Sequence, residues 1–253
     1  MIKASDFTSK LYSIASTKKT VYAWGMFGST ITKARVDAKA KQYPSWYTAS
    51  KIASVFSPLY GSNPPVWGFD CIGLIKGVLW GWNGDESKVY GGAVYASNGV
   101  PDVSADAMIG KCSEVSTDFG NIAIGEFLWM KGHCGVYIGN SKVVESSPKW
   151  TNGVQVTALT ARNWLKHGKL PWVEYSVKEV RNVVNIELSV LGKGDKGEQV
   201  KTLQRLLNAF GGNLDVDGSF GGLTQSALRS YQQKNSLQVD GICGVQSWES
   251  LLK

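Results

Sequence analysis

The sequence predicts an α+β chain of two domains: a larger one that combines an antiparallel sheet with a cysteine-bearing helix, and a small three-helix domain after it. Its 253 residues suit a domain of about 175 residues plus a small module. A predicted hairpin and one apolar helical segment occupy the first part, and a repeated turn with helix-period residues occupies the last. We place the domains at residues 1–177 and 188–253, joined by a linker at 178–187.

The positive charge is concentrated near the beginning of the chain. The formal net charge is +7, and residues 1–51 alone carry nine Lys or Arg against two Asp. A basic face attracts polyanions such as nucleic acid, a membrane surface or anionic wall polymers, although a solvated surface also explains scattered charge. No basic block is interleaved with aromatic residues, so we expect no nucleic-acid partner.

The composition also argues against a membrane span and a metal site. No apolar run reaches the roughly 18 residues of a membrane span, and no secretory signal opens the chain, so we expect synthesis in the cytoplasm without a transmembrane segment. Four cysteines without a C-x-x-C pair, and only two histidines, disfavour a zinc site and a disulfide framework. We therefore expect free thiols, no metal and no cofactor.

The segment from Phe69 to Trp80 carries the first candidate for chemistry. Asp70 and Cys71 precede an apolar stretch of helical character, so we predict that Cys71 lies in the first turn of a helix. The positive end of the helix dipole lowers the pKa of such a thiol and favours the nucleophilic thiolate. Taken alone, the segment is explained equally well by a buried, inert cysteine.

Residues 132–145 are predicted to form a β-hairpin with a Gly-Asn-Ser turn. Side chains alternate between the two faces, so the loop length decides where His133 and Glu145 point. A two-residue loop separates them, whereas a three-residue loop at 139–141 pairs Glu145 with Gly135 and leaves it diagonal to His133 on one face. On one face, the carboxylate can orient the imidazole. Taken singly, they are an ordinary structural histidine and a surface acid.

Together these segments resemble the NlpC/P60 family of papain-like peptidoglycan hydrolases, from about residue 22 to residue 146. The family's Asp-Cys-Ser/Thr-Gly-Leu signature corresponds to residues 70–74, its Gly-Asp-Leu strand to 125–128 and its His-x-Gly-Ile-Tyr-x-Gly strand to 133–139. Its Tyr-x-Trp-Gly motif corresponds to residues 22–25. The resemblance implies a papain-like catalytic domain with an antiparallel sheet and a nucleophile helix.

The resemblance also implies a role for each matching residue. Cys71 is the nucleophile, His133 is the base and Glu145 takes the place of the third polar residue. Tyr22 lies beside the thiolate and assists the oxyanion. The residues expected near the oxyanion or the substrate are Tyr22, Trp24 and Asp70.

The sequence departs from the family pattern at three places. Ile72 replaces a small hydroxyl residue, Glu145 replaces the commoner histidine, and about 40 residues separate Gly28 from Asp70. A carboxylate stabilises imidazolium better than a neutral imidazole does, so a Cys-His-Glu set is chemically sound. The long aromatic segment between Gly28 and Asp70 is expected to cover part of the cleft. The other histidine, His167, is expected in a surface turn without a catalytic role.

Residues 188–253 contain the same D-G-x-Φ-G turn twice, at 217–221 and 240–244, and a helical stretch follows each copy. An earlier helix is expected to begin near Asp195, which with Glu198 resembles a capping box. This pattern resembles the peptidoglycan-binding domain of bacterial and phage wall hydrolases. The side chains expected to be buried by the first helix are Val200, Leu203, Leu206, Leu207 and Phe210.

The two resemblances imply a peptidoglycan hydrolase that cleaves an amide bond of the stem peptide through Cys71, His133 and Glu145. Bacterial peptidoglycan is the implied partner. An endopeptidase is expected, since most of the family are endopeptidases. The open alternatives are an N-acetylmuramoyl-L-alanine amidase, an acyltransferase or deamidase, and an inactive wall-binding protein. Without a signal, the chain is expected to wait in the cytoplasm, as a phage or prophage endolysin does, until the membrane is permeabilised.

Overall fold

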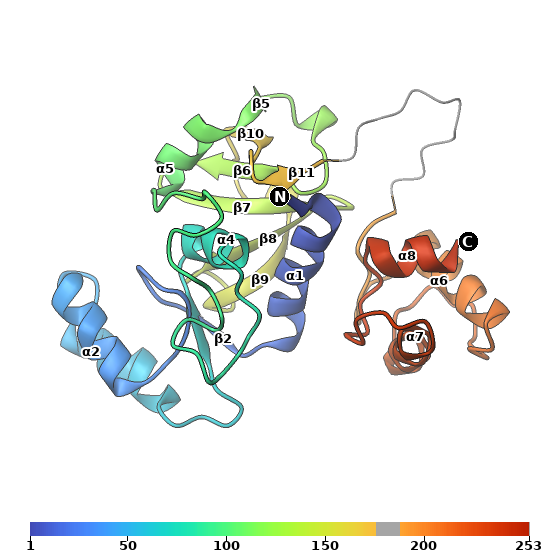
Figure 1. The fold of residues 1–253 in the computed structure, drawn as a ribbon, viewed down its shortest axis with the longest axis horizontal. Helices are drawn as coiled ribbons and strands as arrows, with labels where there is room; N and C mark the ends of the chain where they lie inside the picture. The colour runs from blue at the N-terminus through green and yellow to red at the C-terminus, as the bar shows by residue number, and fades with distance from the viewer. Residues whose placement is uncertain (176–187, 253) are drawn as a thin grey trace.

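The structure, a computed structural model, describes residues 1–175 and 188–252 (Figure 1). The predicted linker at 178–187 lies outside the described residues. The helices are α1 (Ala4–Thr17), α2 (Lys33–Gln42), α3 (Ala49–Lys51), α4 (Cys71–Leu79), α5 (Ala105–Met108), α6 (Glu198–Ala209), α7 (Gly222–Lys234) and α8 (Val245–Leu251). None of the described helices is long and apolar enough to cross a membrane.

The strands of the first domain form three sheets. A six-stranded antiparallel sheet has the order β5-β10-β6-β7-β8-β9, a three-stranded sheet has the order β2-β4-β3, and β1 pairs with β11. The strand bounds are β1 (Ile2–Lys3), β2 (Thr20–Tyr22), β3 (Phe27–Thr30), β4 (Trp67–Phe69), β5 (Ser113–Ser116), β6 (Phe127–Met130), β7 (His133–Gly139), β8 (Lys142–Ser147), β9 (Gly153–Ala158), β10 (Lys166–Lys169) and β11 (Val173–Glu174).

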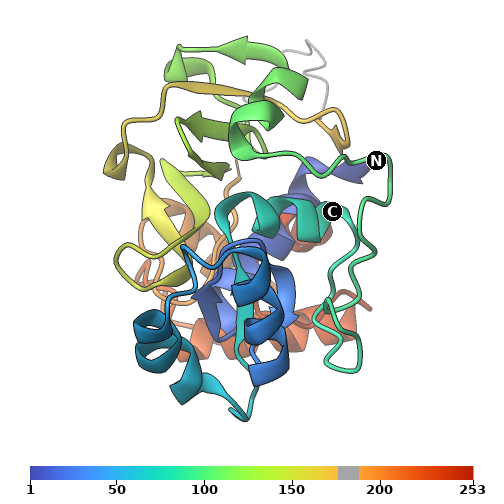
Figure 2. The ribbon, with the colours of Figure 1, turned by 90° about the vertical axis from the view of Figure 1, so that its left-hand side faces the viewer.

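Helices α1 and α4 pack against each other and against the central strands of the large sheet (Figures 1 and 2). Leu74 and Ile75 of α4 are fully buried there, as are Leu11 of α1 and Val136 of β7. The apolar run that predicted a helix after Cys71 therefore forms one wall of the core. This mixture of sheet and helices agrees with the α+β prediction.

The hairpin of β7 and β8 has the side-chain parity that the longer loop predicts, but it reaches that parity differently. Asn140 and Ser141 both have positive φ, as in a two-residue type I′ turn. The register then shifts by one residue between Tyr137 and Gly139, as a β-bulge does. Beyond the bulge Val136 pairs with Val144, so the next pair places Glu145 opposite Gly135. The turn and the bulge together act as the predicted three-residue loop.

The C-terminal domain contains the three predicted helices around one apolar cluster. Val200, Leu203 and Leu207 are buried as expected, whereas Phe210 is 50% exposed. The capping box was wrong, because α6 begins at Glu198 after Gly197 and no side chain caps it. Asp195 instead accepts a hydrogen bond from the Gly192 N–H and contacts the first domain. The expectation about Phe210 fails because this residue ends the helix, where its ring packs on Tyr231 at the surface.

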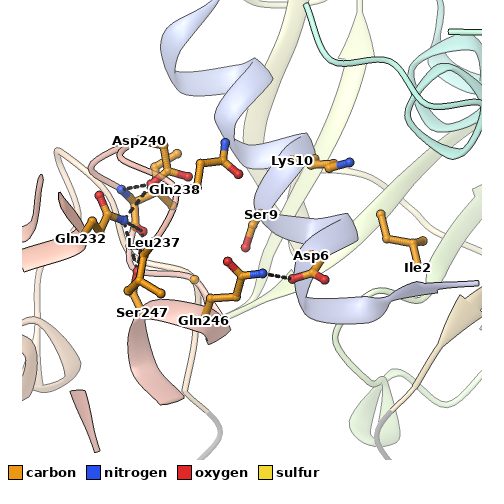
Figure 3. Close-up of a pocket in the computed structure, with 12 residues that line it drawn as sticks. Ile2, Asp6, Ser9, Lys10, Gln232, Leu237, Gln238, Asp240, Gln246 and Ser247 are labelled. Atoms are coloured by element: carbon orange, nitrogen blue, oxygen red, sulfur yellow. Dashed lines mark hydrogen bonds between the residues drawn. The ribbon is translucent and has the colours of Figure 1, made fainter. Parts of the chain in front are cut away.

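Helix α1 lies between the large sheet and the C-terminal domain (Figure 1). The Tyr12 hydroxyl of α1 donates to Asp195 over 3.3 Å, and Lys142 of β8 forms an ion pair with the same carboxylate. Val190 and Ile242 are buried in the same apolar cluster as α1. A polar cavity of about 180 Å³ remains at this interface, where Gln246 donates to Asp6 over 3.4 Å (Figure 3).

Candidate active site

Cys71 is the first residue of α4, and the backbone around it is held by Asp70. One oxygen of the Asp70 carboxylate accepts the Gly73 N–H as an N-cap, and the other accepts the Gly25 N–H over 2.7 Å. A Cβ on Gly73 would lie 2.1 Å from the Met26 carbonyl oxygen, so this glycine permits close helix packing. Asp70 therefore positions α4 and the loop before β3, and both of its oxygens are occupied.

The loop after β2 brings the Tyr-x-Trp-Gly residues to the N-terminus of α4. Tyr22 is buried and lies beside Cys71. Burial, followed by the charges of Cys71 and Asp70, raises the pKa of Tyr22, so the phenol stays protonated as a donor. Trp24 is 42% exposed and lines the groove in front of Cys71.

His133 and Glu145 are joined by a hydrogen bond of 2.6 Å between Nε2 and Oε2. Glu145 has no exposed surface, and its carboxylate also accepts hydrogen bonds from the Thr157 hydroxyl over 2.7 Å and from Arg162 Nε over 2.6 Å. The indole of Trp164 stacks on the imidazole with ring centres 5.7 Å apart. These contacts fix the ring orientation and leave its other nitrogen for Cys71.

The surroundings of Cys71 favour the thiolate. A hydrogen bond from the Cys134 thiol is the largest cause that lowers the pKa of Cys71, and the hydrogen bond and charge of His133 add to it against the opposing effect of burial. Burial by itself lowers the pKa of His133, but hydrogen bonds to Cys71 and Glu145 outweigh it and raise the net value. The two shifts together favour a thiolate–imidazolium pair.

Two carboxyl groups respond differently to burial at this site. Burial raises the pKa of Glu145, but the hydrogen bonds from His133 and Thr157 and the charge of Arg162 outweigh it, so the net pKa is lowered and Glu145 stays ionised. Asp70 has no such cation in contact, and burial raises its pKa to about 7 despite two backbone hydrogen bonds. Glu145 is therefore the carboxylate that can stabilise an imidazolium.

Sequence reasoning missed three residues that the structure brings to the site. Cys134 faces Cys71, and burial and the bond to Cys71 raise its own pKa well above the usual value, so it remains a thiol donor. Arg162 and Trp164 come from the segment after β9. Cys134 could have been noticed as the neighbour of His133, but nothing in the sequence links residues 162–164 to Glu145.

A groove of about 690 Å³ passes in front of Cys71. Its walls are the loop at 24–27, the last turn of α2, the first turns of α4 and the segment 102–106. From the segment before Asp70, Lys39, Gln42 and Tyr43 line this groove. The aromatic residues that suggested a cover over the cleft, Trp46, Tyr47, Tyr60 and Trp67, are not among its lining residues. A peptide of a few residues fits such a volume.

The surface-turn expectation for His167 was wrong. His167 is 2% exposed and lies in β10, between β5 and β6 of the large sheet. Its Nδ1 hydrogen-bonds Glu126, and its Nε2 hydrogen-bonds the Asp118 carbonyl over 2.9 Å. Polar neighbours such as Lys166 and Lys169 suggested exposure, but sheet pairing on both sides buries the intervening side chain. Within the described ranges, no cluster of three or more His, Cys, Asp or Glu could hold a metal ion.

Comparison with known proteins identifies the C-terminal domain. Residues 196–251 match the family described as "Putative peptidoglycan binding domain". The protein therefore carries a peptidoglycan-binding domain at this end, which confirms that part of the sequence prediction. Peptidoglycan is the partner that this match supports.

Curated relatives share only part of the chain. A spore cortex-lytic enzyme of Bacillus cereus is 38% identical over 76 residues, which cover 30% of this chain and 29% of the relative. The N-acetylmuramoyl-L-alanine amidase CwlM of Mycobacterium tuberculosis is 46% identical over 56 residues, which cover 22% of this chain and 14% of the relative. Neither match is long enough to cover the first domain.

Among solved structures, the N-terminal domain of SleB is 38% identical over 27% of this chain and 94% of that chain, with a TM-score of 0.26. A Burkholderia AP3 phage endolysin is 40% identical over 25% of this chain and 24% of that chain, with a TM-score of 0.25. Both matches cover only about a quarter of this chain. The chemistry of the first domain is therefore argued from the residues of its own site.

Proposed function

We propose that the first domain is an NlpC/P60-type cysteine hydrolase that cleaves an amide bond of the peptidoglycan stem peptide. The observation that carries the proposal is the joint placement of Cys71 at the start of α4, with His133 hydrogen-bonded to a buried, ionised Glu145. The Cys-His-carboxylate order is the arrangement that activates a thiol nucleophile. The wall-binding domain on the same chain supports peptidoglycan as the substrate.

The proposed reaction follows from the positions of these groups. The Cys71 thiolate attacks the amide carbonyl carbon, and the oxyanion receives hydrogen bonds from the Tyr22 hydroxyl and the Cys71 N–H, a first-turn donor without an intrahelical acceptor. The imidazolium of His133 gives its proton to the departing amine as the C–N bond breaks. His133 then takes a proton from water, which attacks the thioester and releases the acid and the Cys71 thiolate.

We propose an endopeptidase as the specific activity. Most members of the family that the sequence resembles are endopeptidases, and the groove of about 690 Å³ beside Cys71 has room for a short peptide. The alternative with the same residues is an N-acetylmuramoyl-L-alanine amidase. One curated relative carries that name, but the shared region is too short to include the first domain.

Digestion of purified peptidoglycan tests both the cysteine mechanism and the bond that is cleaved. The protein is expected to release fragments with new amino and carboxyl termini within the stem peptide, identified by mass spectrometry. Cys71→Ala is expected to fold normally and to lose activity by about a thousandfold or more, as enzymes without their nucleophile do. Fragments cut between sugar and peptide would identify an amidase, and undiminished lysis by Cys71→Ala would refute the cysteine mechanism.

Wall binding is assigned to the C-terminal domain, with the enzyme acting on the wall after release through a permeabilised membrane, as an endolysin does. Full-length Cys71→Ala should sediment with insoluble wall. Removal of residues 188–253 should abolish binding at 1 M salt, where screening shortens the distance over which surface charges act to roughly 3 Å. Wall binding that survives removal of this domain at low salt and is lost at 1 M salt would instead make the basic residues of 1–51 the anchor on anionic wall polymers.

A further inference from the structure

The charged side chains that line the groove in front of Cys71 differ in whether they already have partners within the protein. Asp102 forms an ion pair with Lys76 and accepts a hydrogen bond of 2.7 Å from the Tyr95 hydroxyl. Asp106 accepts the Trp129 indole N–H and a backbone N–H, both over 2.8 Å. Both acids therefore already have donors within the protein.

The third acid of the groove, Asp70, is likewise occupied by two backbone N–H groups. The ammonium of Lys39, which also lines the groove, has fewer polar partners than these three acids. Within the ranges that the structure describes, its polar contact is the Gln42 side-chain oxygen at 3.0 Å, and it lies 5.6 Å from the centre of the Tyr43 ring. Lys39 is half-buried, and burial lowers its pKa against the opposing charges of Asp70 and Asp102. In the part of the chain that the structure describes, neither acid forms an ion pair with Lys39, so its charge is only partly compensated.

Lys39 is held at a defined place relative to the nucleophile. The Tyr43 ring, one turn further along the chain, packs against Gly25, whose N–H donates to Asp70 beside Cys71. The Tyr47 hydroxyl donates to the Trp24 carbonyl over 2.9 Å and ties the same segment to the same loop. The end of α2 is therefore anchored to the backbone that positions Cys71.

We propose that Lys39 is a specificity residue that binds a carboxylate of the stem peptide while the scissile amide lies at Cys71. The inference rests on the function proposed above and adds the chemical group that is recognised. Stem peptides carry free carboxylates, and an ammonium half-shielded from water forms a charge-assisted hydrogen bond with such a group. A lysine that merely stabilises the C-terminal turn of α2 would have no effect on substrate choice.

Four values of kcat/KM test the proposal. Soluble muropeptides are prepared with free carboxylates and, in parallel, with those carboxylates converted to amides by ammonia and a carbodiimide. Wild type and Lys39→Met are assayed on both substrates. Amidation is expected to lower the wild-type kcat/KM by about 10- to 100-fold, mainly through KM, because the charge-assisted contact is lost. Lys39→Met is expected to be equally slow on both substrates.

Two further variants distinguish the effect of the Lys39 charge from a general effect of substitution in α2. Lys39→Arg keeps the positive charge and should retain the preference for free carboxylates. Lys41→Met removes an exposed lysine of the same helix that does not line the groove, and should behave as wild type. Equal sensitivity to amidation in wild type and Lys39→Met would overturn the assignment of Lys39. A wild-type enzyme that cleaves neither muropeptide would overturn the proposed function, and this inference with it.

Discussion

Two histidine–glutamate pairs lie in the same six-stranded sheet, and they differ in what surrounds them. The His133–Glu145 pair joins β7 to β8, and the His167–Glu126 pair joins β10 to the start of β6. Each glutamate is buried. The second nitrogen of His133 faces Cys71, however, whereas the second nitrogen of His167 is taken by the Asp118 carbonyl.

This difference explains why only one of the two pairs is proposed to be catalytic. His133 lies next to Cys71, and Cys71 lines a groove of about 690 Å³. His167 is 2% exposed and has both ring nitrogens hydrogen-bonded within the protein. The first pair is therefore suited to proton transfer, and the second to holding strands together.

The largest expected contrast between the pairs is in turnover. His133→Ala should lower kcat/KM on peptidoglycan fragments by about a thousandfold, because both the activation of Cys71 and the protonation of the leaving amine depend on the imidazole. His167→Ala, assayed below its unfolding temperature, should retain kcat/KM within about threefold. Loss of turnover in His167→Ala with retention in His133→Ala would reverse the roles of the two pairs.

The next contrast is in the free energy of unfolding, where the His167 variant is expected to lose more than the His133 variant. His167→Ala leaves the buried Glu126 carboxylate without its partner, which should lower the free energy of unfolding by about 3 kcal/mol. His133→Ala should cost less, since Glu145 keeps Arg162 and Thr157. Urea unfolding of both variants measures the difference. A larger loss for His133→Ala would show that the His133 pair also supports the fold.

A smaller effect is expected when the carboxylates are neutralised. Glu145→Gln should lower kcat by about a hundredfold, because the amide cannot stabilise the imidazolium as the carboxylate does. Glu126→Gln is the matched change in the other pair and should leave kcat unchanged within about twofold. Steady-state kinetics on one muropeptide substrate compares them. A similar loss of kcat in both variants would mean that the effect comes from the sheet and not from His133.

The sequence was sufficient for the parts of the site that depend on local patterns. The apolar run after Cys71 predicted α4, and strand parity predicted that His133 and Glu145 share a face, although a bulge rather than a longer loop produces that parity. The repeated turns predicted the helical domain. Each of these patterns spans fewer than about 30 consecutive residues.

The contacts that could not be predicted join segments distant in the sequence. Arg162 and Trp164 reach the His133–Glu145 pair because of the path of the chain after β9, and that path has no periodic signal. His167 was misplaced because its charged neighbours suggested a surface turn, while pairing of β10 with β5 and β6 buries it. Asp195 was expected to cap a helix, but Tyr12 and Lys142 of the other domain bind it.

The smallest expected effect concerns Cys134, the neighbour of His133 whose thiol donates to Cys71. Cys134→Ala removes this donor, which is the largest cause of the lowered pKa of Cys71, so that pKa should rise toward its ordinary value. The acidic limb of the kcat/KM profile reports formation of the thiolate–imidazolium pair and should therefore move to higher pH, while the rate on the plateau should stay within about twofold.

Cys134→Ser tests whether the donor, rather than the packing of the sulfur, sets the pH dependence. The serine hydroxyl can still donate to the Cys71 thiolate, so its acidic limb should remain closer to wild type than that of Cys134→Ala. Iodoacetamide labelling of Cys71 across the same pH range measures thiolate formation independently of substrate, because the thiolate is the reactive form. If both limbs and both labelling curves coincide with wild type, Cys134 serves only packing. The pKa of Cys71 would then be set by His133 and the start of α4, the features that distinguish this pair from His167 and Glu126.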